Sequence, residues 1–116
     1  MPRQKDDADT MRLSAIEEDI LTVLLGREFY GLEILDFLNP DRPIQLSFGS
    51  LYPALNRLEK KGFISWRWGD VQDGSGGARR KYYKVTGLGA GVLREVQKYR
   101  LTLGERSLGQ SMLGGI

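Results

Sequence analysis

The side chains best suited to chemistry form one cationic and aromatic run, Arg79-Arg80-Lys81-Tyr82-Tyr83. Arginine and lysine bind phosphate oxygens, and a tyrosine hydroxyl can donate a hydrogen bond to the same group. The preceding residues include Gly74-Ser75-Gly76-Gly77, a composition typical of a flexible loop. A flexible loop beside arginines predicts contact with a nucleic-acid backbone or with an electronegative minor groove.

A second polar surface is expected on a helix over residues 47–61. Leu51, Leu55 and Leu58 recur at helical spacing and predict the buried face of that helix. The opposite face and its flank contain small, polar and basic residues, namely Ser47, Gly49, Ser50, Pro53, Asn56, Arg57 and Lys60. Little bulk near the start, followed by hydrogen-bond donors, suits a helix that enters the major groove of DNA.

Individual roles on this helix follow from side-chain chemistry. Asn56 and Arg57 are the candidates for base contact, and Ser50 and Lys60 are the candidates for phosphate contact. Ser47 or Ser50, together with the free amides of the helix start, can also bind a phosphate. An ordinary solvated face is the alternative interpretation of the same pattern.

Pro53 leaves the start of this helix open between two positions. If Ser47 caps the helix, Pro53 lies past the first turn and removes one backbone hydrogen bond. If Ser50 caps the helix, Pro53 lies within the first turn, where proline is tolerated.

Several classes of chemistry are excluded by what the 116 residues lack. The chain contains no cysteine and no histidine, which excludes disulfides, nucleophiles activated by histidine and the usual zinc sites. Residues 87–91 (GLGAG) place the third glycine one position too early for a dinucleotide-binding loop. No acidic pair has a spacing typical of acid–base catalysis. We therefore expect neither an enzyme nor a bound cofactor or metal.

Composition is that of a single globular domain. Hydrophobic residues make up 41%, charged residues 28%, and the mean hydropathy is −0.35. No apolar run approaches the ~18 residues of a membrane span, and no secretory signal is evident, so a cytoplasmic protein without membrane contact is expected. Charge is divided unevenly along the chain. Residues 1–56 contain 5 Lys/Arg and 10 Asp/Glu, whereas residues 57–116 contain 12 Lys/Arg and 5 Asp/Glu. A basic half indicates a polyanionic partner.

Local patterns predict the remaining elements. Ser14-Ala15-Ile16-Glu17 has capping-box spacing and begins a helix that Gly26 ends. Further elements are expected as a helix over 31–38, strands over 63–68 and 82–86, and a helix over 87–103. Trp66 and Trp68 share one strand face, where packing is favoured over ligand stacking.

The helix over 87–103 has an apolar stripe that such a short chain cannot fully cover. The stripe consists of Leu88, Val92, Val96, Tyr99 and Leu103. We expect a second copy of the chain to bury it in a homodimer. The predicted division is a flexible acidic arm (1–12), a DNA-binding domain (13–86), a dimerisation helix (87–103) and a glycine-rich tail (104–116).

The order of these elements is mainly α with a small β-hairpin (an α+β arrangement) and describes a winged helix-turn-helix. Three segments resemble, in the right order, motifs of the PadR-like transcriptional regulators. They are residues 30–34 (YGLEI), residues 48–64 (FGSLYPALNRLEKKGFI), and residues 79–86 (RRKYYKVT) with Gly89. The resemblance covers about residues 13–100, with Phe48 where the family usually has proline and Gly87 at a typically polar position.

The resemblance implies a bacterial repressor that binds double-stranded promoter DNA and dimerises through its C-terminal helix. A small-molecule effector is left open, because the larger helical C-terminal domain common in the family has no counterpart here. The alternative hypothesis is a winged helix that binds proteins and not DNA, since a fold does not determine a function.

Overall fold

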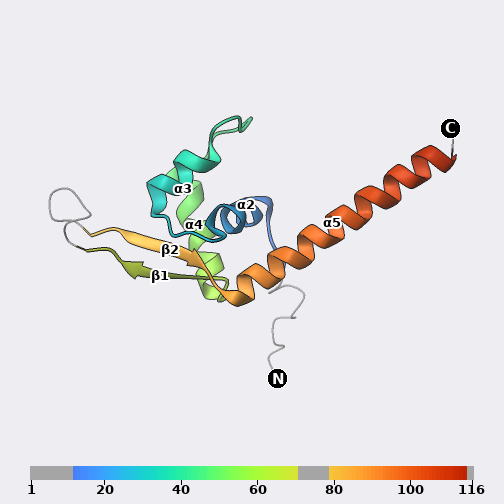
Figure 1. The fold of residues 1–116 in the computed structure, drawn as a ribbon. Helices are drawn as coiled ribbons and strands as arrows, with labels where there is room; N and C mark the ends of the chain where they lie inside the picture. Colours follow the sequence, from blue (N-terminus) through green and yellow to red (C-terminus); the bar gives the residue numbers. More distant parts are fainter. Residues whose placement is uncertain (1–11, 71–78, 115–116) are drawn as a thin grey trace, which may run out of the picture.

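The computed structural model describes residues 12–70 and 79–114, with side chains as far as Gln110. The expectations for the acidic arm and for the loop over 71–78 therefore lie outside the described residues, apart from Arg12. The elements are α2 (Ala15–Leu24), α3 (Gly31–Leu38), α4 (Phe48–Lys60), β1 (Ile64–Trp68), β2 (Lys81–Val85) and α5 (Gly87–Gly114). The chain is mostly helical with one small antiparallel sheet, which confirms the predicted winged helix-turn-helix (Figure 1).

The start of α2 is closed by the predicted capping box. The Ser14 amide donates to Glu17 Oε1 at 2.7 Å, and the Glu17 amide donates to Ser14 Oγ at 3.2 Å. Two of the amides that a helix start leaves unpaired are thereby satisfied. Gly26 follows the helix with φ of 72°, a left-handed conformation that favours glycine.

The start of α4 decides between the two positions for Pro53. Ser47 is the residue that precedes the first helical turn, so Pro53 lies in the helix interior and the alternative start at Ser50 is wrong. Proline has no amide hydrogen to donate to the carbonyl of Gly49, four residues earlier. Gly49 is exposed, so water can reach this carbonyl.

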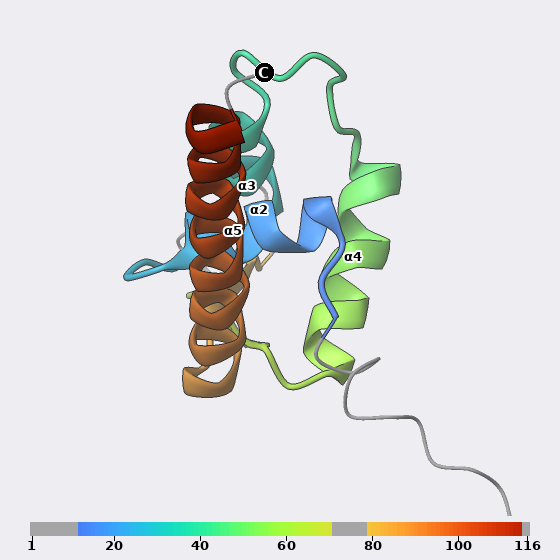
Figure 2. The same cartoon turned by 90° about the vertical axis from the view of Figure 1, so that its right-hand side faces the viewer.

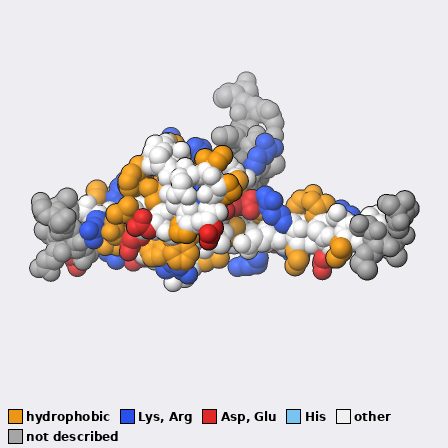
Figure 3. All heavy atoms as spheres, turned by 90° about the horizontal axis from the view of Figure 1, so that it is seen from above, with side chains coloured by type: hydrophobic (Ala, Val, Ile, Leu, Met, Phe, Trp, Pro, Cys, Tyr) orange, Lys and Arg blue, Asp and Glu red, His pale blue; other side chains and the backbone are white. Residues whose placement is uncertain are grey.

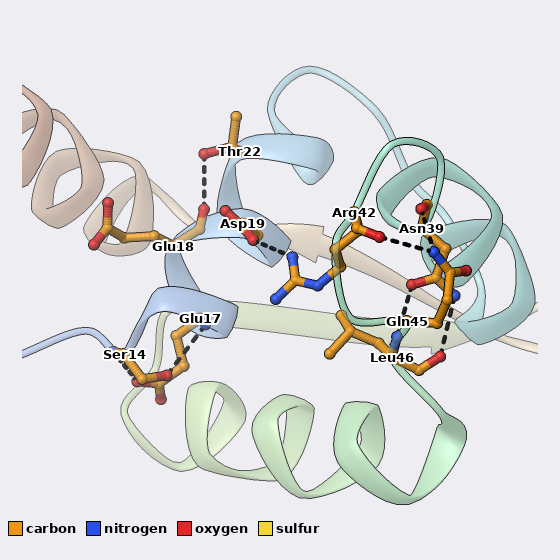
Figure 4. A network of polar contacts seen from close by, with 9 residues as sticks. All are labelled: Ser14, Glu17, Glu18, Asp19, Thr22, Asn39, Arg42, Gln45 and Leu46. Carbon is orange, nitrogen blue, oxygen red and sulfur yellow. Dashed lines mark hydrogen bonds and ion pairs between the residues drawn. The ribbon is translucent and has the colours of Figure 1, made fainter.

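A polar network holds the loop between α3 and α4 (Figure 4). The Asn39 side chain donates to the Leu46 carbonyl at 3.0 Å and accepts from the Leu46 amide at 2.8 Å. Gln45 donates to the Asn39 carbonyl at 2.8 Å, and Arg42 forms a 2.6 Å ion pair with Asp19 of α2. The network therefore fixes the direction in which the chain enters α4.

The core lies where α2, α3 and α4 pack against the sheet. Its fully buried side chains include Ile20, Ile34, Leu55 and Phe63. The predicted stripe on α4 is confirmed, since Leu51, Leu55 and Leu58 are all buried. Burial of this stripe leaves the opposite face of α4 at the surface, where a ligand can reach it.

The sheet is a hairpin extended by one isolated bridge. Strands β1 and β2 are antiparallel, with Trp66 opposite Tyr83 and Trp68 opposite Lys81. On the other edge of β2, Phe29 and Tyr83 exchange backbone hydrogen bonds of 3.1 and 2.8 Å. These bonds tie the hairpin to the segment that precedes α3.

Helix α5 starts against the core and then leaves it. The Gly89 amide donates to Thr86 Oγ1 at 3.1 Å, and a Cβ at Gly89 would lie 2.2 Å from the Phe63 carbonyl oxygen. Only glycine allows this close approach. Figures 1 and 2 show α5 projecting from the body of the domain, with α2 between α4 and α5.

The predicted end of α5 at Leu103 is wrong, because the helix continues to Gly114 through the glycine-rich segment. Residues between the glycines, such as Glu105 and Arg106, are good helix formers, and a nucleated helix grows one residue at a time. No helix in the described ranges is both long and apolar enough to cross a membrane.

Candidate nucleic-acid interface

The face of α4 opposite its leucine stripe, here called the outer face, is exposed along its whole length. Its predicted members Ser47, Gly49, Ser50, Pro53, Asn56, Arg57 and Lys60 are all at the surface. The Ser47 side chain makes no capping hydrogen bond, although Ser47 precedes the first turn. The first turn of α4 is therefore exposed, and a phosphate can contact a helix only where its first turn is exposed.

A buried carboxylate positions the basic end of α4. Glu17 is only 2% exposed, and its Oε2 accepts from Lys61 Nζ at 3.0 Å and lies 3.5 Å from Arg57 Nε. Burial alone would raise the pKa of Glu17, but hydrogen bonds from Ser14 and Lys61 lower it overall. The carboxylate is therefore ionised at neutral pH and anchors α4 to α2.

Two of the three hairpin cations lie over aromatic rings. The Arg80 guanidinium lies 4.4 Å from the centre of the Tyr30 ring, and Lys81 Nζ lies 4.0 Å from that of Trp66. Arg79 is exposed. Within the described residues, no carboxylate forms an ion pair with these three cations. No described carboxylate therefore neutralises these three charges, and arginine and lysine in this state are groups that bind anions.

The two hairpin tyrosines point to opposite faces of β2, as the alternation of a strand requires. Tyr82 is half-buried with its ring edge-on to Tyr30, at 5.6 Å between centres, whereas Tyr83 is only 4% exposed. Burial, with contributions from Tyr52 and Glu59, raises the pKa of Tyr83 to about 12. Its hydroxyl therefore stays protonated at neutral pH and can act as a donor.

The hairpin and α4 meet at a surface hollow of about 290 Å³, here called the interface hollow. It is lined by Tyr30, Gly31, Tyr52, Trp68, Arg79, Arg80, Lys81 and Tyr83. Tyr52 lies one helical turn before Asn56, so the hollow borders the outer face directly. The two surfaces predicted to contact DNA consequently share one side of the molecule.

Sequence reasoning missed four of these lining residues: Tyr30, Gly31, Tyr52 and Trp68. Tyr52 was placed only at the edge of the apolar stripe, and nothing in the spacing of Tyr30 and Gly31 connects them with a hairpin fifty residues later. The resemblance of residues 30–34 to a family motif was the one signal that could have drawn attention to them.

The two tryptophans of β1 differ in how far they are buried. Trp66 is half-buried against the core, and its indole nitrogen donates to Glu59 Oε1 at 2.8 Å. Trp68 is 50% exposed and meets Trp66 edge-on, with 5.2 Å between ring centres. Trp66 is therefore packed as predicted, whereas Trp68 packs against Trp66 on one side and leaves half of its surface exposed.

The predicted dimerisation stripe is divided between the core and the surface. Val92 is 4% exposed and belongs to the chain's own core, while Val96 is half-buried. Leu88, Tyr99 and Leu103 are 54%, 60% and 43% exposed. Figure 3 shows hydrophobic side chains among charged ones along the protruding part of α5, where Leu101 and Leu108 add to the exposed set.

Comparison with known proteins identifies the family of this chain. The family model described as "Transcriptional regulator PadR-like family" matches residues 20–95. The chain belongs to the PadR-like family. Because the family consists of transcription regulators and not of enzymes, the expectation that this chain is not an enzyme is confirmed.

Solved PadR-family structures share the fold over most of the chain. The chain is similar to a PadR family transcription regulator from Clostridium difficile, with 30% identity and a TM-score of 0.69, covering 85% of this chain and 99% of that one. It is also similar to a PadR family regulator from Eggerthella lenta, with 29% identity, a TM-score of 0.66, and coverage of 84% and 80%.

A protein of Lysinibacillus sphaericus named "Uncharacterized protein X" is 36% identical over 85 residues, which are 72% of this chain and 75% of that protein. As a PadR-like winged helix, the chain is a DNA-binding transcription regulator.

Proposed function

We propose that this PadR-like protein is a homodimeric repressor that binds double-stranded promoter DNA. The observation that carries the proposal is the interface hollow, which joins the outer face of α4 to three hairpin cations. Those cations have no carboxylate partner within the described ranges, so a polyanion would supply their counter-charges.

The two surfaces have different tasks. The outer face of α4 enters the major groove, where Asn56 and Arg57 contact base edges and Ser50 and Lys60 contact phosphates. The hairpin cations Arg79, Arg80 and Lys81 contact the adjacent backbone or minor groove. Tyr82 and Tyr83 add hydroxyl donors, of which Tyr83 is the more restricted by burial.

The dimer places two such surfaces on one duplex. A second copy would cover the exposed residues of α5, chiefly Leu88, Tyr99 and Leu103, with Val96 at the margin. Val92 supports this helix from the core side. A twofold dimer reads half-sites about one helical turn apart, roughly 34 Å, and represses by occupying promoter DNA against polymerase.

Salt dependence tests DNA binding without knowledge of the operator. If about six phosphates are neutralised, the slope of log K against log salt is near −5 for a generic duplex. Replacing Arg79 and Arg80 with alanine weakens binding to every duplex and makes the slope shallower. No affinity for duplex DNA at low salt would contradict the proposal and favour a protein-binding module.

The target and compartment are proposed on resemblance. The compact architecture and residues 74–77 (GSGG) resemble Pex, a cyanobacterial PadR-like clock-modifier protein that represses a clock-gene promoter. We propose a circadian clock promoter as the first target to test, and the cytoplasm, where bacterial promoters lie, as the site of action. Selection of bound sequences from random duplexes would identify the operator and its symmetry together.

A further inference from the structure

A carboxylate lies at the interface without a cation to neutralise it. Glu59 is exposed on α4, three residues after Asn56, so the two side chains are neighbours on the helix surface. No ion pair joins Glu59 to a cation within residues 12–70 and 79–110. Such a charge repels the phosphates of a bound duplex, so Glu59 favours DNA binding only if it acts through another group.

The group that Glu59 contacts belongs to the hairpin. The Trp66 indole nitrogen donates to Glu59 Oε1 at 2.8 Å. Burial, and after it the charges of Tyr52 and Glu59, raise the pKa of Tyr83, which lies opposite Trp66 on β2. Glu59 therefore faces the hairpin, and its hydrogen bond is a side-chain link between α4 and β1.

Trp66 in turn supports one of the hairpin cations. Lys81 Nζ lies 4.0 Å from the centre of the Trp66 ring, but 5.8 Å from that of Trp68, its direct partner across the strands. Lys81 thus lies over its diagonal neighbour, which a long side chain can reach in an antiparallel pair. A carboxylate that accepts from the indole N–H makes the ring face more negative and strengthens its attraction for a cation. The contacts form one chain from α4 through Glu59 and Trp66 to Lys81.

We propose that Glu59 is a positioning residue for DNA binding, which holds Trp66 against α4 and thereby places the Lys81 ammonium beside the outer face. This inference rests on the proposed function and adds to it a residue that itself contacts no DNA. Without the link, Lys81 keeps its charge but must be ordered when the duplex binds, and ordering one free lysine costs about fivefold in Kd. Repulsion from one exposed carboxylate costs less, about twofold, so the net effect of Glu59 is tighter binding.

Two neutral variants separate position from charge. Glu59→Gln keeps an oxygen that accepts from Trp66, whereas Glu59→Met has nearly the same length and helix propensity but no such oxygen. We expect the Kd for a generic fluorescent duplex, measured by anisotropy at low salt, to fall about twofold in Glu59→Gln, because one repulsive charge is lost. In Glu59→Met the lost placement outweighs the same gain, so Kd should rise about two- to threefold. Equal Kd values for the two variants would overturn the proposal.

A double-mutant cycle shows whether Glu59 acts through Lys81. Lys81→Ala should cost the same factor in wild type and in Glu59→Gln, but about fivefold less in Glu59→Met, where the lysine is no longer held. A merely structural effect of Glu59→Met would leave the cost of Lys81→Ala unchanged, and that result would also overturn the proposal. All variants are compared at a temperature at which circular dichroism shows them to be folded.

The link itself can be observed without DNA. The chain has only two tryptophans, so Trp68→Phe leaves a single indole N–H resonance, that of Trp66. In this background Glu59→Met should move the resonance upfield, because a hydrogen bond is lost, and Glu59→Gln should move it less. An unchanged resonance in Glu59→Met would show that the link is absent and overturn the proposal. If the link were present but the wild-type protein bound no duplex, the proposed function would fail, and the role of Glu59 in binding with it.

Discussion

Replacing Glu17 with glutamine tests how the outer face of α4 is held in place. The carboxylate is 2% exposed, accepts from Lys61 at 3.0 Å and from the Ser14 amide at 2.7 Å, and lies 3.5 Å from Arg57. Glutamine has nearly the same shape and can still accept from Ser14. The change therefore removes chiefly the negative charge that α4 faces.

The expected loss is the strength of one charge-assisted hydrogen bond, about 2 kcal/mol. Lys61 and Arg57 remain partly exposed, at 19% and 49% of their side chains, so water limits the loss below that of a fully buried pair. For a domain of this size we expect the unfolding temperature to fall by about 8 °C at pH 7. Circular dichroism at the helix band measures it.

The same variant makes a prediction about pH. Folding lowers the pKa of Glu17 below its ordinary value of 4.5, since its hydrogen bonds outweigh burial. The stabilisation is therefore complete above pH 4.5 and is lost as the pH falls through the lowered pKa of the folded state. The difference in unfolding free energy between wild type and Glu17→Gln should therefore shrink as the pH falls below 4.5.

Glu28→Gln is the matched control, because Glu28 forms a 3.0 Å ion pair with Arg67 at the surface. The side chains there are 32% and 55% exposed, so the same chemical change should cost less than about 1 kcal/mol. The reasoning is refuted if both variants unfold at the same temperature, or if the Glu17 difference is independent of pH.

Two further predictions concern α5. Gly89→Ala forces a Cβ against the Phe63 carbonyl and should lower stability by about 1–3 kcal/mol in urea unfolding, whereas Gly91→Ala, whose Cβ would meet nothing within 4 Å, should not. Leu103→Glu should convert the proposed dimer to a monomer in sedimentation while leaving the unfolding temperature of the domain nearly unchanged, since Leu103 is 43% exposed; a persistent dimer would place the interface elsewhere. A point substitution is used because a truncation before Leu88 would also remove Val92 and Leu93 from the core.

Local chemistry explains which parts of the fold were predictable from sequence. The capping box at Ser14 and Glu17, the helix over 31–38 and the leucine stripe of α4 all depend on residues within two helical turns of one another. The end of α5 was predicted wrongly, because glycine propensity outweighed the helix formers around Gly104 and Gly109 in the sequence pattern.

The interface required the tertiary structure. Sequence periodicity placed Asn56 and the leucines on opposite sides of one helix, but it could not show which distant residues would border that face. Tyr30, Tyr52 and Tyr83 come together at the interface hollow only because Phe29 bonds to β2 and because α3 packs against α4.

By itself, the sequence determined the elements, the basic character of the second half and the membership of a DNA-binding family. These follow from composition and from spacing along one helix or strand. Only the tertiary structure decided that Val92 is core, that Glu17 anchors Arg57 and Lys61, and that Tyr83 lines one hollow together with the hairpin cations. The physical reason is that burial and charge pairing depend on distances between elements, and local spacing does not specify those distances.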